Sequence, residues 1–240
     1  MSIVTVTLNH RELLECTMLS VINQTYSNIE YIIVDGGSTD HSIELIKKNE
    51  SHITKWITEK DEGIYDAMNK GARLASGDYL CFLNSGDMLV SDNTIEQVVK
   101  DIASGKDASI FYGNICVKNS ENALKEKKAS EPTNKQRMFF CHQSAFVSIK
   151  WLQKYPFDTR YKMSADLKFF KQCFYADCVF KHLDYPIVIY DRSGISHRNR
   201  NAGLRENVAV IKEMDHGISR LLFLFLLYIV LYWRMLNNKS

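Results

Sequence analysis

Small polar and acidic residues follow each of four apolar segments in the first ninety residues of the chain. The segments at 3–8, 30–34, 54–57 and 79–83 have the length and composition of buried strands. The polar residues that stand at their ends are Asn9, Asp35, Glu59, Asp61, Glu62, Asn84 and Asp87. Carboxylate and amide oxygens can hold a Mg²⁺ or Mn²⁺ ion that binds a diphosphate, and they can accept hydrogen bonds from a nucleobase or a ribose. These residue types therefore predict a site for a phosphorylated ligand.

Helical patterns separate the four predicted strands, and this alternation predicts an α/β fold with a parallel sheet. Asn9 is expected to cap the first helix, with Glu12 three residues further on, and Thr39 or Asp40 to cap the second. Gly77 is expected to end the third helix. Because ligands of open α/β sheets bind outside the carboxyl ends of the strands, the polar strand ends should meet at one edge.

Two common kinds of nucleotide site are absent from the sequence. No G-x-G-x-x-G follows the first predicted strand, and no G-x-x-x-x-G-K-[ST] occurs anywhere in the chain. The formal net charge is only +2, so no global field favours nucleic acid. The six cysteines include no C-x-x-C pair, and the chain starts without a basic leader or a long apolar segment. These features predict reduced thiols and a cytoplasmic protein.

Two segments differ from the regular alternation. The charged stretch at 118–135 is expected to be a mobile loop or lid. The run "LLFLFLLYIVLYW" at 221–233 lies between Arg220 and Arg234, and thirteen helical residues span only about 20 Å. This length predicts a segment that lies in the membrane surface, which would make the protein peripheral on the inner face of the cell membrane. The alternative for this run is a buried helix or an oligomer contact.

Five stretches of the sequence, taken in order, resemble family 2 glycosyltransferases with the GT-A fold. They are "VTLN", "YIIVDGGSTD", "EKDEGIYDAMNKGARLASGDYLCFLNSGD", "CHQSAFV" and "SADLKFF", which run from residue 6 to residue 170. The resemblance is strongest to enzymes of bacterial exopolysaccharide assembly of the colanic-acid type. It implies an inverting transfer of a sugar from a UDP- or GDP-sugar to a hydroxyl of a glycan or lipid-linked acceptor, in bacterial surface polysaccharide synthesis.

The resemblance also implies an architecture. It implies a Rossmann-like sheet that is parallel in its first half and mixed overall, with helices on both faces. Residues 1–216 would form the GT-A domain, with a nucleotide-binding half at 1–90 and an acceptor-side half at 91–216. Residues 217–240 would form a short membrane-associated helix and its flanks.

Each matching position then acquires an expected role. Asp35 would contact the base or ribose, with Asn9, Asp61 and Asp66 near the nucleotide, although Asp66 could instead be an acid that favours the start of a helix. His142 and Gln143 match the acceptor-side segment; the alternative for His142 is a hydrogen-bonded histidine of the core.

The end of the fourth predicted strand departs from the family pattern. The usual ending is L-D-A-D-D, whose D-x-D pair handles the metal and the sugar-nucleotide, but here Asn84 and Gly86 occupy the two positions of that pair. Asn84 is still expected to contact the donor, and Asp87 is expected to bind Mg²⁺ or Mn²⁺ with fewer charged ligands than usual. The alternative is a plain turn, with the metal held elsewhere or not needed.

Asp166 is the expected general base for the acceptor hydroxyl. It matches the second acid of the Glu-Asp pair that opens a helix in the family, although Ala165 replaces the first acid. The alternative is a helix N-terminal acid beside Ser164 as cap.

A basic stretch near the tail is a further candidate, for the donor diphosphate or for the phosphates of a lipid carrier. Its members are Arg192, His197, Arg198, Arg200 and Arg205, which could equally form a solvated loop. Because Asn84 and Gly86 alter the D-x-D pair, a non-catalytic relative that binds nucleotide-sugar or glycan as a scaffold stays open as a second function. A nucleotidyltransferase is a more distant third.

Overall fold

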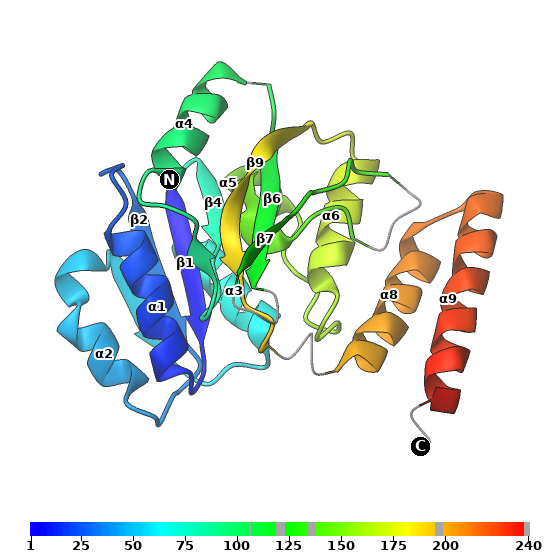
Figure 1. Cartoon of the computed structure of the whole chain (residues 1–240), viewed down its shortest axis with the longest axis horizontal. Coiled ribbons are helices and arrows are strands. Elements are labelled where there is room, and N and C mark those ends of the chain that lie inside the picture. The colour runs from blue at the N-terminus through cyan, green and yellow to red at the C-terminus, as the bar shows by residue number, and fades with distance from the viewer. Residues whose placement is uncertain (106, 119–122, 134–137, 195–198, 238–240) are drawn as a thin grey trace.

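The computed structural model describes residues 1–105, 107–118, 123–133, 138–194 and 199–237, with the side chains of 219 and 234–237 left out (Figure 1). The described strands are β1 Ser2–Thr7, β2 Glu30–Asp35, β3 Lys55–Thr58, β4 Tyr79–Phe82, β5 Met88–Leu89, β6 Ile110–Lys118, β7 Leu124–Lys127, β8 Ala145–Ser148 and β9 Phe180–Tyr190. The described α-helices are α1 Arg11–Ile22, α2 Ser42–Lys48, α3 Ile64–Leu74, α4 Thr94–Ser104, α5 Ile149–Lys154, α6 Ala165–Tyr175, α8 Arg200–Met214 and α9 Gly217–Asn237. The short 3₁₀ turns are η1 Glu50–His52 and η2 His142–Ser144.

The described strands form one mixed sheet with the order β3-β2-β1-β4-β8-β6-β9-β5, and β7 pairs with β6. The pairs β1–β2, β1–β4 and β2–β3 are parallel, whereas β4–β8 and β6–β8 are antiparallel. The prediction of a sheet that is parallel in its first half and mixed overall is therefore confirmed. All four strands predicted in the first ninety residues are present, and no end is shifted by more than one residue.

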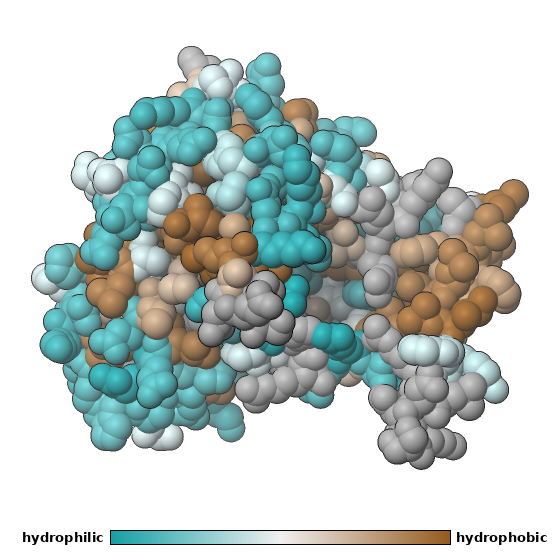
Figure 2. Space-filling view, viewed as in Figure 1, coloured by the Kyte–Doolittle hydropathy of each residue, from teal (hydrophilic) through white to brown (hydrophobic). Residues whose placement is uncertain are grey.

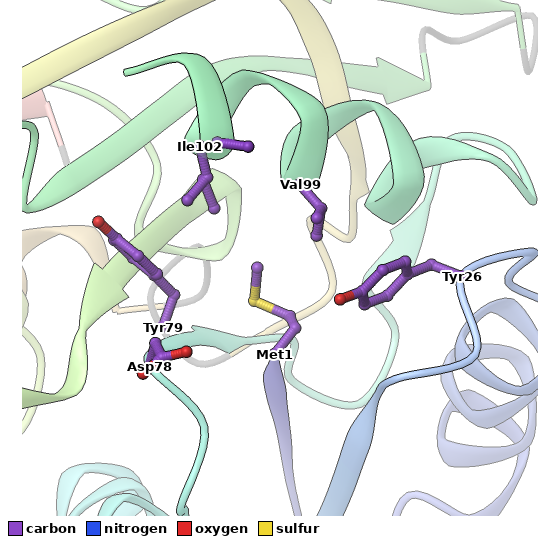
Figure 3. Close-up of a pocket in the computed structure, with 7 residues that line it drawn as sticks. Met1, Tyr26, Asp78, Tyr79, Val99 and Ile102 are labelled. Carbon is purple, nitrogen blue, oxygen red and sulfur yellow. The ribbon is translucent and has the colours of Figure 1, made fainter. Parts of the chain in front are cut away.

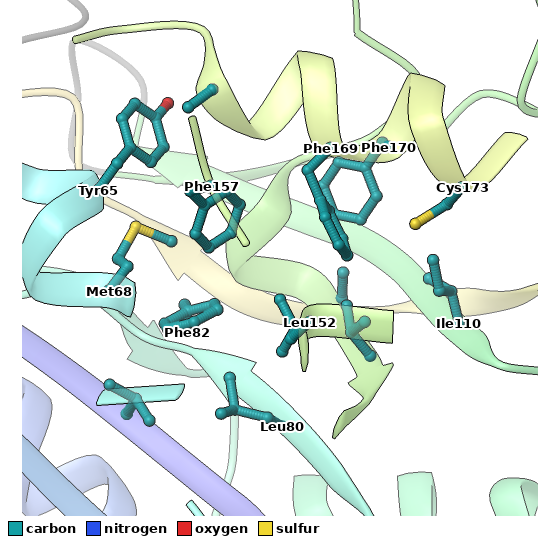
Figure 4. Close-up of a cluster of buried hydrophobic side chains, with 14 of the residues drawn as sticks. Tyr65, Met68, Leu80, Phe82, Ile110, Leu152, Phe157, Phe169, Phe170 and Cys173 are labelled. Atoms are coloured by element: carbon teal, nitrogen blue, oxygen red, sulfur yellow. The ribbon is translucent and has the colours of Figure 1, made fainter. Parts of the chain in front are cut away.

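Alternating side chains of the central strands bury both faces of the sheet. Ile3 and Ile33 face a cluster that α1, α2 and α4 complete, while Val4 and Val34 face a cluster that α3, α5 and α6 complete. Figure 4 shows the second cluster, where Phe82 of β4 lies beside aromatic rings from the segments around α6. Helices therefore cover both faces of the sheet (Figure 1).

Several expected helix ends are wrong because tertiary hydrogen bonds replace local capping. Asn9 has a left-handed backbone with φ 54°, and its side chain accepts the Thr39 N–H at 2.7 Å instead of capping α1. Asp40 caps α1 instead, although it lies about thirty residues away in the sequence, because it accepts the N–H of Arg11. It also accepts the first N–H of α2, that of Ser42. The helix α3 ends at Leu74, three residues before Gly77.

The charged stretch at 118–135 is only partly the loop that the sequence predicts. Residues 124–127 form β7, which pairs antiparallel with the end of β6. Residues 119–122 and 134–135 of this stretch lie outside the described part of the chain.

The tail forms a helical hairpin in which α9 packs on α8 (Figure 1). Leu224, Leu227 and Leu231 are the buried stripe of α9, and they contact a stripe on α8. Among the described residues, no helix is both long enough and apolar enough to cross a membrane. The alternative of a buried helix holds only for one side of α9, because ten of its other apolar side chains are exposed.

Gly71 sets the distance between α3 and the sheet. A Cβ atom at Gly71 would lie 2.3 Å from Val4 Cγ1, and Val4 is fully buried in β1. We expect Gly71→Ala to lower the free energy of unfolding by about 1–3 kcal/mol, because α3 must move away from the sheet. Urea unfolding measures this, with Gly203→Ala in α8 as the matched control, since a Cβ there meets Met163 only at ordinary contact distance. Equal effects of the two substitutions would contradict the packing argument.

Candidate functional site

The loop that follows β4 is pinned in place by Thr17 of α1. The Thr17 hydroxyl donates to the Asp87 carbonyl at 2.8 Å and accepts the Gly86 N–H at 2.9 Å. Gly86 has φ 102°, and a Cβ atom there would lie 2.8 Å from the Asp191 carboxylate. An acid at position 86 would thus be strained and would meet another acid. This geometry explains why glycine stands where the family usually has the second acid of its pair.

The carboxyl group of Asp87 turns into the protein. Its side chain is buried, and Oδ1 accepts the Asp191 N–H at 2.9 Å. Burial raises the pKa of Asp87 to about 7, against smaller lowering effects of the Asp191 N–H, the His142 charge and Gln143. Unlike an ordinary aspartate, Asp87 is only partly ionised near neutral pH.

The metal-ligand role that the sequence predicts for Asp87 stays a prediction. Its carboxylate is buried, and Oδ1 is engaged by the Asp191 N–H. No group of three or more His, Cys, Asp or Glu side chains with metal-binding geometry occurs in the part of the chain that the structure describes. Mg²⁺ is commonly held by one or two carboxylates together with substrate phosphates and water, so Asn84 Oδ1 and one carboxylate do not by themselves define a cation site.

Asp166 stands at the centre of a hydrogen-bond network drawn from three elements. Its Oδ1 accepts the Tyr65 hydroxyl from α3 at 2.8 Å and the Leu167 N–H at 2.8 Å. Its Oδ2 bonds His142 Nδ1 in η2 at 3.0 Å, and His142 Nε2 lies 3.3 Å from Asn84 Nδ2 at the end of β4. The structure therefore brings together Asn84, His142 and Asp166, which the sequence separates by more than eighty residues.

Asp166 is held as an accessible carboxylate. Burial alone raises its pKa, but the hydrogen bond and charge of His142, then the Tyr65 hydroxyl and the Leu167 N–H, outweigh burial and lower the pKa below its usual range. The side chains of Asp166 and His142 each keep 14 % of their surface exposed, so a ligand can reach them. Oδ1 already has two donors, which leaves Oδ2 as the oxygen that can accept another proton donor.

Tyr65 is a member of this network that the sequence reasoning missed. Burial and the neighbouring Asp166 charge raise the pKa of Tyr65 well above its ordinary value, so it remains a hydroxyl donor. A sequence signal existed, because Tyr65 lies within one of the segments that resemble the family, one position before Asp66.

Asp35 is fully buried at the end of β2 and shapes the loop that follows it. Its Oδ2 accepts the N–H groups of Gly37 and Ser38 and the Thr58 hydroxyl, at 3.1, 2.9 and 2.6 Å. Its Oδ1 has no hydrogen-bond partner among the described residues. The hydrogen bonds of Oδ2 thus stabilise the turn after β2, while Oδ1 remains available to a ligand.

Asp61 and Asp66 belong to an ion-pair cluster around Lys70. Lys70 Nζ lies 2.7 Å from Asp61, 3.3 Å from Asp66 and 3.0 Å from Glu59. A Cβ atom on Gly36 would lie 2.7 Å from Asp61 Oδ2, so this cluster borders the turn after β2. The Lys70 charge gives both carboxylates a structural partner, and Asp66 also accepts the Glu62 N–H at the start of α3.

Unpaired buried oxygens gather at the carboxyl ends of three neighbouring strands. In the described part of the chain, the buried side-chain atoms without a hydrogen-bond partner are Thr7 Oγ1, Asp35 Oδ1, Asn84 Oδ1, Ser85 Oγ and Arg220 Nε. The four oxygens follow β1, β2 and β4, which lie side by side in the sheet. Because a buried polar group without a partner costs about 1–3 kcal/mol, such a concentration indicates a place where a ligand supplies the missing bonds.

The remaining predicted residues differ in their setting. Gln143 is buried, and its Oε1 accepts the Cys141 thiol at 2.7 Å, so it stabilises the site without being exposed to a ligand. Arg192 is exposed directly after Asp191. Arg200 and Arg205 lie on α8, while His197 and Arg198 lie outside the described residues. All six cysteines are free, as expected.

A hollow of about 290 Å³ lies at the opposite edge of the sheet (Figure 3). Met1, Tyr26, Tyr79 and Val99 are among its lining residues, and Met1 and Tyr79 stand at the amino ends of β1 and β4. It is therefore separate from the polar strand ends, and Asp78 is the acidic residue in its lining.

Comparison with known families places residues 2–164 in a match to the model described as glycosyl transferase family 2. The chain belongs to glycosyl transferase family 2. It is a transferase enzyme, and the resemblance that the sequence motifs carry is confirmed. The matched span ends two residues before Asp166, so this match does not test the assignment of the base.

Curated relatives and solved structures agree with this family. A "PGL/p-HBAD biosynthesis glycosyltransferase" of Mycobacterium bovis is 29 % identical over 181 residues, which cover 72 % of this chain and 69 % of the relative. The fold is similar to that of TarS from S. aureus in complex with UDP-GlcNAc, with a TM-score of 0.72 and 15 % identity over 93 % of this chain and 70 % of that one. A mannosyltransferase from Pyrobaculum calidifontis, in complex with GDP-Man and Mn²⁺, has a TM-score of 0.69 and 17 % identity over 96 % and 68 % of the two chains.

Asp87 should make the stability of the enzyme depend on pH. Since its pKa rises from an ordinary value of 3.8 to about 7 on folding, the folded state keeps a proton that the unfolded state has lost. This contribution lowers the free energy of unfolding as pH rises from about 4 to 7, by up to roughly 4 kcal/mol.

We therefore expect Asp87→Asn to gain stability relative to the native chain as pH rises through this window. Urea unfolding at pH 4.5, 6 and 8 measures the difference, and Asp92→Asn on an exposed loop is the control. A constant difference between Asp87→Asn and the native chain at all three pH values would rule out the raised pKa.

Proposed function

We propose that this enzyme transfers a glycosyl group from a nucleoside-diphosphate sugar to a hydroxyl of a glycan or lipid-linked acceptor, with inversion at the anomeric carbon, in bacterial surface polysaccharide synthesis. One observation carries the proposal. The unpaired oxygens at the ends of β1, β2 and β4 share a sheet edge with the Asp166 network, to which Asn84 links them. Donor recognition and proton removal would thus take place side by side.

The donor half of the site offers acceptors for a nucleoside. Asp35 Oδ1 and Thr7 Oγ1 are buried and unpaired, and they stand at the ends of adjacent strands. A base N–H or a ribose hydroxyl would supply the missing donors, which is the chemistry that a nucleoside presents. The complexes of TarS with UDP-GlcNAc and of the archaeal mannosyltransferase with GDP-Man, on the same fold, support this class of donor. Asn84 Oδ1 and Ser85 Oγ would accept hydrogen bonds from the transferred sugar.

The reaction requires one bond to form as another breaks. The acceptor oxygen attacks the anomeric carbon from the face opposite the diphosphate, the bond between that carbon and the diphosphate oxygen breaks, and the nucleoside diphosphate leaves with the electron pair. Asp166 Oδ2 takes the hydroxyl proton as the new bond forms, and His142 and Tyr65 hold the carboxylate in place. A positioned base of this kind contributes on the order of 10²–10⁴-fold to the rate.

The leaving diphosphate needs positive charge near it. Arg192 follows Asp191, whose N–H bonds Asp87 in the loop after β4, so a guanidinium is available at this loop. The need for Mg²⁺ or Mn²⁺ stays a prediction of the sequence, and release of nucleotide measured with and without Mn²⁺ tests it.

The tail supports an acceptor at a lipid surface. Ten of the sixteen exposed large apolar side chains in the described chain belong to α9, and Figure 2 shows hydrophobic surface over this helix on the face in view. They include Tyr228, Tyr232 and Trp233, residue types that favour the membrane interface. Arg205 and Lys212 of α8 are exposed, which favours anionic headgroups. We infer that residues 217–240 attach the enzyme to the inner face of the cell membrane.

The function is tested by release of nucleotide from UDP-, GDP- and dTDP-sugars with a lipid-linked or glycan acceptor. We expect one donor to be turned over, and Asp166→Asn to lower kcat at least a hundredfold while donor affinity, measured by calorimetry, stays within threefold. Asp177→Asn, in the exposed turn after α6, is the matched control and should keep native kcat. Donor binding without any turnover would favour the scaffold alternative, and full turnover in Asp166→Asn would exclude Asp166 as the base.

Attachment of the tail is tested by sedimentation with vesicles of phosphatidylglycerol and phosphatidylethanolamine. The native chain should bind, and the double variant Leu222→Glu with Phe225→Glu should bind roughly a hundredfold more weakly, because two large apolar side chains no longer enter the lipid. The double variant Leu19→Glu with Leu124→Glu adds the same two charges at exposed positions outside α9 and should bind like the native chain. If the native chain does not bind the vesicles but forms dimers through α9, this result would contradict membrane attachment and support the oligomer alternative.

A further inference from the structure

The segment at 162–164, directly before α6, is held by one face of α8. Glu206 accepts two consecutive backbone N–H groups, that of Lys162 through Oε1 at 3.0 Å and that of Met163 through Oε2 at 2.8 Å. Ser164 donates its hydroxyl to Asn207 Oδ1 at 2.8 Å and to the Gly203 carbonyl at 3.3 Å. Positions 203, 206 and 207 have the spacing of neighbours on one helix face.

This contact replaces the local cap that the sequence predicts for α6. Ser164 flanks the start of the helix, but its side chain makes no hydrogen bond to the helix and points to α8 instead. Since Asp166 lies in the first turn of α6, the orientation of its carboxylate follows the orientation of this helix start. The start of α6 is therefore held by α8, some forty residues further along the chain, in addition to the direct hydrogen bonds that Asp166 receives.

The same segment also reaches the donor half of the site. Lys162 Nζ donates to the Glu62 carbonyl at 2.8 Å, and its stem lies 3.6 Å from where a Cβ would stand on Gly63. Gly63 has φ 125° and flanks α3, the helix that carries Tyr65. The two donors to Asp166 Oδ1 are the Tyr65 hydroxyl of α3 and the Leu167 N–H of α6. Both helices thus start next to residues 162–164.

We propose that Glu206 and Asn207 of α8 are positioning residues for Asp166, which hold the base in the line of attack without touching the substrate. This inference rests on the proposed function, in which Asp166 removes the acceptor proton. A displacement of about 1 Å in a catalytic group can lower the rate a hundredfold, whereas donor binding at the ends of β1 and β2 does not depend on α8. Loss of the hydrogen bonds that join Glu206 and Asn207 to residues 162–164 should therefore lower kcat and leave the donor KM almost unchanged.

The test compares two glutamates of the same helix. Glu206→Gln keeps the shape of the side chain, but its amide N–H₂ faces one of the two backbone N–H groups, so one hydrogen bond is lost. Glu213→Gln is the matched control, because Glu213 also joins α8 to the α6 region, through Lys168 and Tyr161, without contacting 162–164. We expect kcat to fall at least tenfold in Glu206→Gln and to stay within twofold in Glu213→Gln, with the donor KM within twofold in both.

A second pair of variants separates positioning from folding. Asn207→Asp keeps an oxygen that accepts the Ser164 hydroxyl and should retain most of kcat, while Asn207→Ala should lower it at least fivefold. Thermal unfolding of each variant shows whether loss of rate follows loss of stability. Equal kcat in Glu206→Gln and Glu213→Gln, or kcat that tracks the melting temperature across all four variants, would overturn the proposal. Absence of turnover in the native chain would instead overturn the proposed function.

Discussion

His142 joins the two halves of the site by bonding Asp166 on one side and Asn84 on the other. A neutral imidazole that donates from Nδ1 to a carboxylate must accept at Nε2, and the Asn84 amide provides that donor. An aspartate at position 84 would offer Nε2 only another acceptor. The Asn84 amide carries both a donor and an acceptor, so it can complete the hydrogen bonds of the imidazole that orients Asp166.

The parallel part of the sheet explains why this contact can form. Hydrogen bonds from Gly36 to the Thr7 carbonyl and from Ser85 to the Val6 carbonyl continue the sheet past the strand ends, on both sides of β1. They place the turns after β2 and β4 on either side of the same strand. Asp166 then arrives from the second half of the chain, on α6, which packs on the sheet through Phe169 and other core residues. The packing of α6 and the ends of three strands thus define one edge.

Regular features of the sequence predict the parallel half of the sheet well, because apolar runs and helical periods are local, whereas the sequence pattern assigns none of the five later strands that the structure describes. The acids at the strand ends are also visible in the sequence, since carboxyl ends of parallel strands must share an edge. The direction in which each acid points is not visible. Asp87 points inward because its carboxylate accepts the N–H of Asp191, more than a hundred residues later in the chain. Asn9 does not cap α1, because its side chain accepts the N–H of Thr39 instead. Capping rules fail at Ser164 for the same reason, since its partner lies on α8.

The tail hairpin is attached to the transferase domain by charge as well as by apolar contact. Lys171 of α6 is fully buried and pairs with Asp215 between α8 and α9, at 2.7 Å, and Glu213 pairs with Lys168. A buried ion pair of this kind adds little net stability, but removing one partner costs about 3–5 kcal/mol. The pair therefore fixes one arrangement of the hairpin. Glu206 and Glu213 of α8 contact the segments around α6, whereas Arg205 and Lys212 are exposed, and Lys212 Nζ lies 5.4 Å from the centre of the Tyr228 ring of α9.

The lowered pKa of Asp166 limits how this base can work. A folded-state pKa below the unfolded value means that the ionised carboxylate stabilises the fold above the unfolded pKa, and that this contribution is lost as pH falls through the folded pKa. The same shift makes Asp166 a weak base toward a free hydroxyl at neutral pH. Proton transfer must then accompany bond formation at the anomeric carbon, since the hydroxyl becomes acidic only as its oxygen gains that bond. Under this constraint the rate depends on the alignment of Oδ2 with the attacking oxygen more than on basicity, which is why the contacts that orient Asp166 matter as much as the carboxylate itself.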